Sequence, residues 1–144
     1  MSDLWTVAVM VSGGLFVGGV VSIAWERVPA WRGAPFPEFR EAFAHTLRRV
    51  DKLQPALLSV LLVSTAGFAI SSDGTARTLA WVAAAGFLAI LIGSLAWLVP
   101  IQRRLSSGSG IDDEGLRAHW NHGHLIRTLA ALAAFVLATV ATAI

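Results

Sequence analysis

The sequence predicts an all-α protein, an integral membrane four-helix bundle that forms a single domain. Two observations lead to this prediction. Hydrophobic residues make up 56% of the 144 residues and charged residues only 14%, whereas soluble domains are usually about 45–50% apolar and about 25% charged. The few charges also leave four long uncharged runs. Together these features disfavour a soluble enzyme, a disordered chain and a nucleic-acid-binding protein. The absence of cysteine excludes disulfides and thiolate metal sites.

The four runs predict transmembrane helices, because about 20 apolar residues cross a bilayer and none of the runs alternates with the period of two of a membrane β-strand. The predicted spans are 4–25, 53–72, 78–102 and 124–144. The first span lacks the basic start of a signal peptide and is too long for its apolar segment.

Helical extensions are predicted on the N-terminal sides of the second and fourth spans, over 38–52 and 112–123. Pro55 predicts a bend where the first extension meets its span, and Pro100 a kink or an end of the third helix. Acidic residues at 112–114 favour a helix start there.

The basic residues predict the orientation of the chain. Ten of the eleven Lys and Arg residues lie on one side, in the two long loops or, for Arg127, at the start of the fourth span, and only Arg77 lies on the opposite side. Because cytoplasmic loops are enriched in Lys and Arg, we expect both long loops in the cytoplasm and both termini outside, in the plasma (inner) membrane.

The fourth span places two ionisable residues at the membrane edge. Its uncharged run, 128–144, is shorter than a bilayer requires, so His124 and Arg127 are expected at the cytoplasmic edge of the hydrocarbon. A charge at such depth usually faces the bundle interior and has a partner, although Arg127 could also extend to the headgroups. The candidate partners are Glu26, Glu41 and Asp51. A face of small residues on the first span is expected to pack against another helix, and a further interpretation is that it directs Glu26 into the bundle.

Polar and aromatic residues thus gather at the cytoplasmic end, where they predict a pocket. The candidate catalytic residues are His124, Arg127, His45 and Glu26. The candidate substrate-binding residues are Trp120, Trp25, Trp31, Arg48 and Arg49.

Three interpretations of this pocket stay open. In the first, it is a catalytic site for an apolar aromatic substrate from the bilayer, with His45 or His124 as base and Arg127 stabilising an oxyanion. In the second, His45 and His124 ligate haem iron or another metal, with Glu26 as a further ligand. In the third, the polar residues form a rim that binds lipid headgroups. His119 and His122 are given no functional role.

The motifs resemble those of the anthrone oxygenase-like family of small four-span membrane proteins. The resemblance rests on Leu98-Val99-Pro100-Ile101-Gln102 at the end of the third span, and on the Trp120, His124 and Arg127 spacing before the last one. Gln102 stands where that family commonly has Asn. The segment 14–18 with Pro29, and His45 ten residues before Pro55, also fit the pattern.

The resemblance implies oxidation of a small aromatic or polyketide-type substrate by molecular oxygen. It leaves open whether a haem or metal is required. The alternative is a non-catalytic bundle that binds haem, metal or lipid, alone or as a subunit of a larger complex. The bilayer is the expected partner, nucleic acid is not expected, and Gly14 with Gly18 could support a homo-oligomer.

Overall fold

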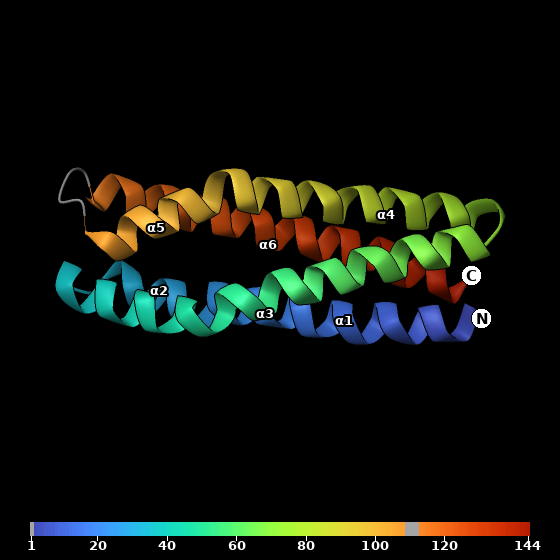
Figure 1. Ribbon diagram of the computed structural model, residues 1–144, viewed down its shortest axis with the longest axis horizontal. Coiled ribbons are helices and arrows are strands. Elements are labelled where there is room, and N and C mark those ends of the chain that lie inside the picture. Colours follow the sequence, from blue (N-terminus) through green and yellow to red (C-terminus); the bar gives the residue numbers. More distant parts are fainter. Residues whose placement is uncertain (1, 109–112) are drawn as a thin grey trace.

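The computed structural model describes residues 2–108 and 113–144, with the side chains of all of these except Ser2 and Asp51. All the secondary structure within these residues is helical, and it forms four rods (Figure 1). The first rod joins α1 (Ser2–Ser22), η1 (Ile23–Arg27) and α2 (Val28–Arg32), and the second is α3 (Phe36–Ser71). The third joins α4 (Gly74–Gly93), η2 (Ser94–Leu98) and α5 (Val99–Ser107), and the fourth is α6 (Asp113–Ala143).

The rods run up and down around a common core. α1 packs on α3 and α6, and α4 packs on the same two helices, so the four form a closed ring. Both termini lie at one end, beside the turn between α3 and α4, and α2, α5 and the first turns of α6 lie at the other (Figure 1). We call this second end the basic end. The predicted all-α four-helix fold is confirmed.

Small residues set the close approach of α4 and α6. The buried side chains between them are mostly alanine: Ala80, Ala83, Ala84, Ala131, Ala134, Ala138 and Ala141. A Cβ at Gly86 would lie 3.2 Å from that of Ala134. Membrane helices pack closely through such residues because lipid offers no hydrophobic driving force for helix association.

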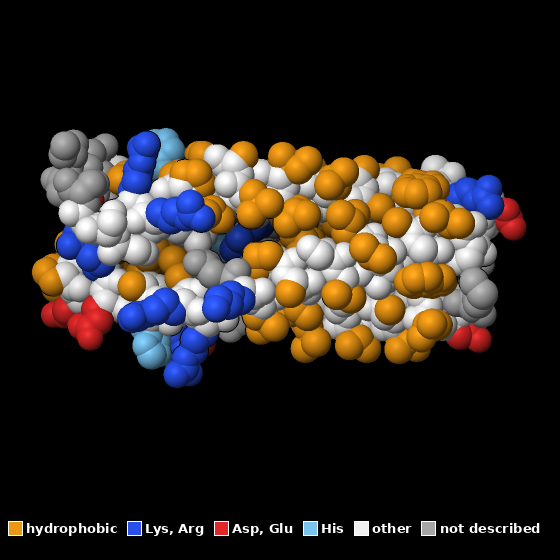
Figure 2. All heavy atoms as spheres, in the orientation of Figure 1, with side chains coloured by type: hydrophobic (Ala, Val, Ile, Leu, Met, Phe, Trp, Pro, Cys, Tyr) orange, Lys and Arg blue, Asp and Glu red, His pale blue; other side chains and the backbone are white. Residues whose placement is uncertain are grey.

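The outer surface matches a membrane environment. Four helical stretches are long and apolar enough to cross a bilayer, within Asp3–Arg32, Lys52–Ser71, Gly74–Ser107 and Asp113–Ala143. Apolar side chains cover the middle of the bundle, and Lys and Arg gather at the basic end (Figure 2). The protein is therefore a four-span membrane protein. Which end faces the cytoplasm stays a prediction from the charges.

Two prolines lie just after turns of π-helix. Pro29 follows η1 and Pro100 follows η2, and in both turns the residue before the proline donates its N–H to a carbonyl five residues back. A proline ring clashes with the carbonyl four residues before it, and the wider π-turn relieves that clash. The third helix consequently continues through Pro100 rather than ending there. α3 likewise continues as one helix through Pro55.

The structure is also helical on the N-terminal side of the fourth span. α6 begins at Asp113, whereas residue 112 lies outside the described residues. Asp113 and Glu114 occupy its first turn, where the helix dipole favours negative charge.

Gly123 on α6 provides a test of this packing. A Cβ there would lie 2.7 Å from Leu98 Cδ2 and 3.1 Å from the Trp97 ring, so η2 lies directly against the glycine. We expect Gly123→Leu to destabilise the protein by about 1–3 kcal/mol through overpacking. Thermal unfolding in detergent, followed by circular dichroism, measures this effect. Gly14→Leu is the matched control, because no atom lies within 4 Å of its Cβ position. Equal melting temperatures for the two variants would contradict the close contact.

Candidate functional site

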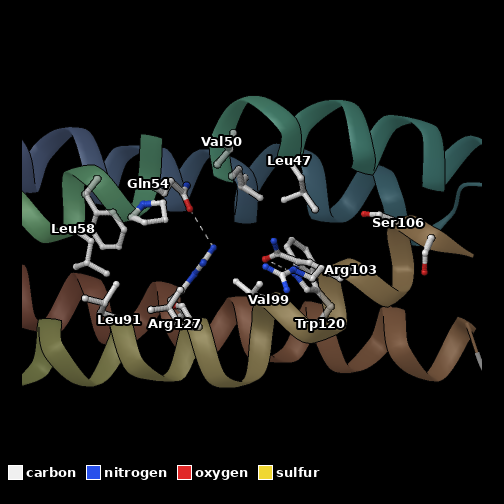
Figure 3. Close-up of a pocket in the computed structure, with 17 residues that line it drawn as sticks. Leu47, Val50, Gln54, Leu58, Leu91, Val99, Arg103, Ser106, Trp120 and Arg127 are labelled. Carbon is white, nitrogen blue, oxygen red and sulfur yellow. Dashed lines mark hydrogen bonds between the residues drawn. The ribbon is translucent and has the colours of Figure 1, made fainter. Parts of the chain in front are cut away.

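A cavity of about 600 Å³ lies in the half of the bundle nearer the basic end (Figure 3). α3 forms one wall and η2 with α5 forms the opposite one, while Trp120 and Arg127 of α6 close the inner side. The cavity opens on the side of the bundle, where Figure 2 shows a hollow with a basic side chain at its depth. A volume of this size is typical of small-molecule sites, which span roughly 300–1,000 Å³.

The cavity walls are mainly apolar, and most of the polar groups lie at two places. The apolar lining residues are Phe16, Ile23, Leu47, Val50, Pro55, Leu58, Leu91, Leu95 and Val99. Arg127 reaches across the inner part of the cavity to Gln54 on α3 (Figure 3). Gln102, Arg103, Ser106 and Ser107 lie on α5 toward the basic end. A planar apolar ligand with oxygen substituents would match this distribution.

Arg127 is held from behind by His124. Arg127 Nη2 donates to His124 Nδ1 at 2.8 Å and to Gln54 Oε1 at 3.4 Å. His124 Nε2 lies 3.2 Å from the carbonyl oxygen of Val20 on α1. A carbonyl only accepts and a guanidinium only donates, so these partners specify the tautomer with its proton on Nε2. Both ring nitrogens are then engaged in holding α1, α6 and the guanidinium together.

Trp120 fixes the other side of the His124 ring. The two rings are stacked, with centroids 5.0 Å apart and planes 7° apart. Trp120 Nε1 donates to Gln102 Oε1 at 3.3 Å, which ties α6 to α5. Trp120 also packs against Trp31 and Phe43 in the aromatic core of the basic end. His124 is completely buried by these contacts.

One buried hydroxyl in the cavity lining has no hydrogen-bond partner among the described residues. Ser94 Oγ is buried and makes no hydrogen bond there, although Ser94 lines the cavity from the π-turn η2. A buried hydroxyl without a partner is costly, so it is a candidate to hydrogen-bond a ligand.

The sequence model of the anthrone oxygenase family matches residues 43–137. This match covers more than half of the chain. The chain belongs to the anthrone oxygenase family. No curated protein and no solved structure matches it.

The anthrone oxygenase match includes most of the cavity. It runs from the first half of α3 to the last third of α6, and so contains Gln54, Trp120, His124 and Arg127. α1, η1 and α2 lie outside it, and with them Trp25, Glu26 and Trp31.

The structure brings together three of the residues predicted from the sequence, Trp120, His124 and Arg127. Trp31 is buried and contacts Trp120 but does not line the cavity. These four come from α2 and α6.

The other predicted residues face outward. Trp25 is 84% exposed, and Glu26 is exposed beside Arg27, its nearest basic group at 3.8 Å. Glu26 was expected inside the bundle on a regular helical spacing, but it lies in η1, and a π-turn shifts the positions that follow it. His45, Arg48 and Arg49 are exposed on α3 because Leu47, Val50, Gln54 and Leu58 occupy its cavity face at helical spacing.

The expected metal pair is separated by the same arrangement. His45 is exposed on α3, whereas His124 is buried with both nitrogens engaged. No group of three or more His, Asp or Glu side chains that could hold a metal occurs in the described residues. Of the candidate partners for Arg127, Glu26 and Glu41 are exposed, and the side chain of Asp51 lies outside the described part.

Sequence reasoning missed Gln54, Ser94 and Arg103. Gln54 could have been predicted from the sequence, because it is an amide near the start of an otherwise apolar span. Polar groups at that depth usually face the interior of the bundle. No feature of the sequence singled out Ser94, since an isolated serine in a membrane helix commonly hydrogen-bonds to the backbone of its own helix.

Proposed function

We propose that this protein is a membrane oxygenase that oxidises a small aromatic or polyketide-type substrate with molecular oxygen in the cavity. The observation that carries the proposal is the Arg127 guanidinium, fixed by His124 and Gln54 at the wall of a mainly apolar cavity. Membership of the anthrone oxygenase family supports the same reaction class.

The reaction uses the acidity of a methylene group opposite a ring carbonyl. Loss of one proton from that carbon gives an enolate, with its negative charge on the carbonyl oxygen. The carbanionic carbon adds dioxygen and, after protonation, forms a carbon hydroperoxide. Loss of water then leaves a second carbonyl, so the CH₂ group and O₂ become C=O and H₂O. The substrate carbon is oxidised and dioxygen is reduced.

Arg127 stabilises the enolate in this scheme. A fixed guanidinium within a site of low polarity lowers the energy of a developing oxyanion more than it would in water. Ser94 and Gln54 offer further hydrogen bonds to substrate oxygens, and Trp120 presents an aromatic wall. The side opening admits an apolar substrate from the bilayer.

His124 is a positioning residue in this proposal rather than the general base expected from the sequence. Its Nδ1 lone pair, the basic site of the tautomer, accepts from Arg127, so abstraction of a substrate proton would break that contact. Binding a metal or haem iron through His124 would break one of the same two contacts. The proposed steps therefore use neither a metal nor a haem.

The experiment supplies 1,8-dihydroxyanthrone to the purified protein in lipid nanodiscs under air. Oxygen uptake and quinone absorbance should rise together, in equal molar amounts. Empty nanodiscs measure the spontaneous oxidation of the anthrone. A rate no higher than that of the empty nanodiscs would reject this reaction for the anthrone probe, and a 2:1 ratio of O₂ to quinone, with release of hydrogen peroxide, would reject the water-forming stoichiometry.

Variants of two residues predicted from the sequence test whether those side chains belong to the catalytic site. We expect His45→Ala and Glu26→Gln to retain the wild-type oxidation rate to within about twofold, because both side chains are exposed outside the cavity. Steady-state oxygen uptake at saturating anthrone measures this. A loss of about 100-fold in either variant would return that side chain to the catalytic site.

We also propose that the basic end faces the cytoplasm of the plasma (inner) membrane, on the charge asymmetry alone. Gly14 and Gly18 are exposed on α1, with no atom within 4 Å of either Cβ position. They therefore do not mediate packing within the chain, and association of two copies through them stays a prediction.

A further inference from the structure

A second pocket lies beside α6, on a different face of the helix from Trp120 and His124. It has a volume of about 340 Å³ and lies between α2 and α6 at the basic end. We call it the headgroup pocket, lined by Arg32, Glu114, Arg117, Asn121, His122 and Leu125, with Ala118. The proposed oxidation uses none of these residues.

Asn121 is the unusual group in this pocket. Its side chain is only 8% exposed, and Oδ1 is buried with no hydrogen-bond partner among the described residues. A buried amide oxygen without a partner is costly, so its retention at a pocket wall indicates a ligand that hydrogen-bonds to it. The amide can donate and accept, and therefore suits a ligand rich in oxygen atoms.

The charges of the pocket favour an anion. Arg117 is committed to the fold: its Nη1 donates to the carbonyl oxygens of Trp31 and Ala34, and its Nη2 pairs with Glu114. Arg32 is exposed in the last turn of α2 and makes no hydrogen bond or ion pair with residues that the structure describes. Since Arg117 and Glu114 neutralise each other, Arg32 leaves the pocket with a net positive charge. A guanidinium prefers a phosphate or a carboxylate.

The surface next to the pocket is apolar and continues along the helix. Leu125 lines the pocket, and the exposed residues Leu129, Leu132, Val136 and Val140 follow it on α6 at spacings of three or four residues. These side chains share one face of the helix. A ligand with a charged head in the pocket and a hydrocarbon chain along this face would satisfy both surfaces.

We infer that the headgroup pocket binds the phosphodiester of a membrane phospholipid, with Arg32 pairing with the phosphate and Asn121 hydrogen-bonding to headgroup oxygens. The acyl chain lies along the apolar face that begins at Leu125. The pocket thus fixes one lipid at the junction of α2 and α6, independently of the proposed oxidation.

Native mass spectrometry of the detergent-solubilised protein tests the inference, with dioleoylphosphatidylglycerol titrated as the probe. We expect the first lipid adduct to form about tenfold more weakly in Arg32→Gln and in Asn121→Leu. Arg104→Gln is the matched control, because it removes an exposed charge at the same end outside both cavities. Its adduct should keep the wild-type affinity.

Three results would overturn the inference. Equal weakening in Arg32→Gln and Arg104→Gln would mean that only the general charge of the basic end attracts lipid. Unchanged binding in Asn121→Leu would remove the pocket from the interaction. Inorganic phosphate at about 10 mM should not displace the lipid, because the acyl chain contributes most of the binding. Displacement by phosphate would assign the pocket to a free anion instead. Arg32 is exposed, so its variant keeps the test decisive even if Asn121→Leu fails to fold.

Discussion

Replacing Arg127 by methionine should lower the rate of anthrone oxidation by about 100- to 1,000-fold, the usual effect of removing a group that stabilises an oxyanion. Methionine keeps much of the side-chain length and fills the same space but has no charge and no donor. The oxidation rate of Arg127→Lys should lie between those of the wild type and Arg127→Met. An ammonium keeps the charge but cannot donate to His124 and Gln54 with the same geometry. Oxygen uptake by purified protein in nanodiscs measures all three rates.

The control for this experiment is Arg103→Met. Arg103 lines the same cavity but is exposed on α5, toward the basic end. Its loss should change the rate by no more than about fivefold, since an exposed charge is screened by water. Equal losses in Arg103→Met and Arg127→Met would show that the cavity needs positive charge in general and that the held guanidinium has no special role. Full activity of Arg127→Met would reject the proposed site.

His124 gives the second large effect, through its contact with Arg127. His124→Ala should lower the oxidation rate by about 100-fold, because the guanidinium loses the acceptor that orients it and the Val20 carbonyl loses its donor. His124→Gln should recover to within about tenfold of wild type. The glutamine amide can donate to Val20 and accept from Arg127, so it reproduces both hydrogen bonds without being a base.

The glutamine variant separates positioning from proton transfer. A general base would leave His124→Gln as inactive as His124→Ala, and the wild-type rate would follow the protonation of a histidine across pH. A positioning residue predicts the rescue and a profile of the same shape in wild type and His124→Gln. Both variants should still elute as helical protein in detergent. If only the alanine variant unfolds, the glutamine comparison alone decides the question.

The four spanning helices could be predicted from the sequence because charged residues are so scarce. A bilayer excludes unpaired charges and unsatisfied backbone, so four uncharged runs of this length can form little besides spanning helices. The extension before the fourth span followed from the acidic residues of its first turn. Trp120, His124 and Arg127 also followed, since spacings of four and three residues place them together on one helix.

The residues contributed by other helices were harder to predict. Glu26 was misplaced because it lies within η1, where the helical phase changes, and no simple sequence rule predicts a π-turn. Trp25 lies in the same turn and is 84% exposed. His45, Arg48 and Arg49 were attractive as ionisable groups, but the neutral residues between them face the cavity. The residue of α3 that contacts Arg127 is Gln54, which accepts a hydrogen bond from it across the bundle.

By itself, the sequence determined that this is a membrane bundle of four helices with its polar residues at one end, because the cost of burying charge in lipid acts on each segment separately. Only the tertiary structure decided which of those residues share a site. The phase of each helix, and the register at which α1, α3 and α6 meet, place the Val20 carbonyl and Gln54 beside His124 and Arg127. Such contacts join residues 73 to 104 positions apart, and depend on packing that no local pattern contains.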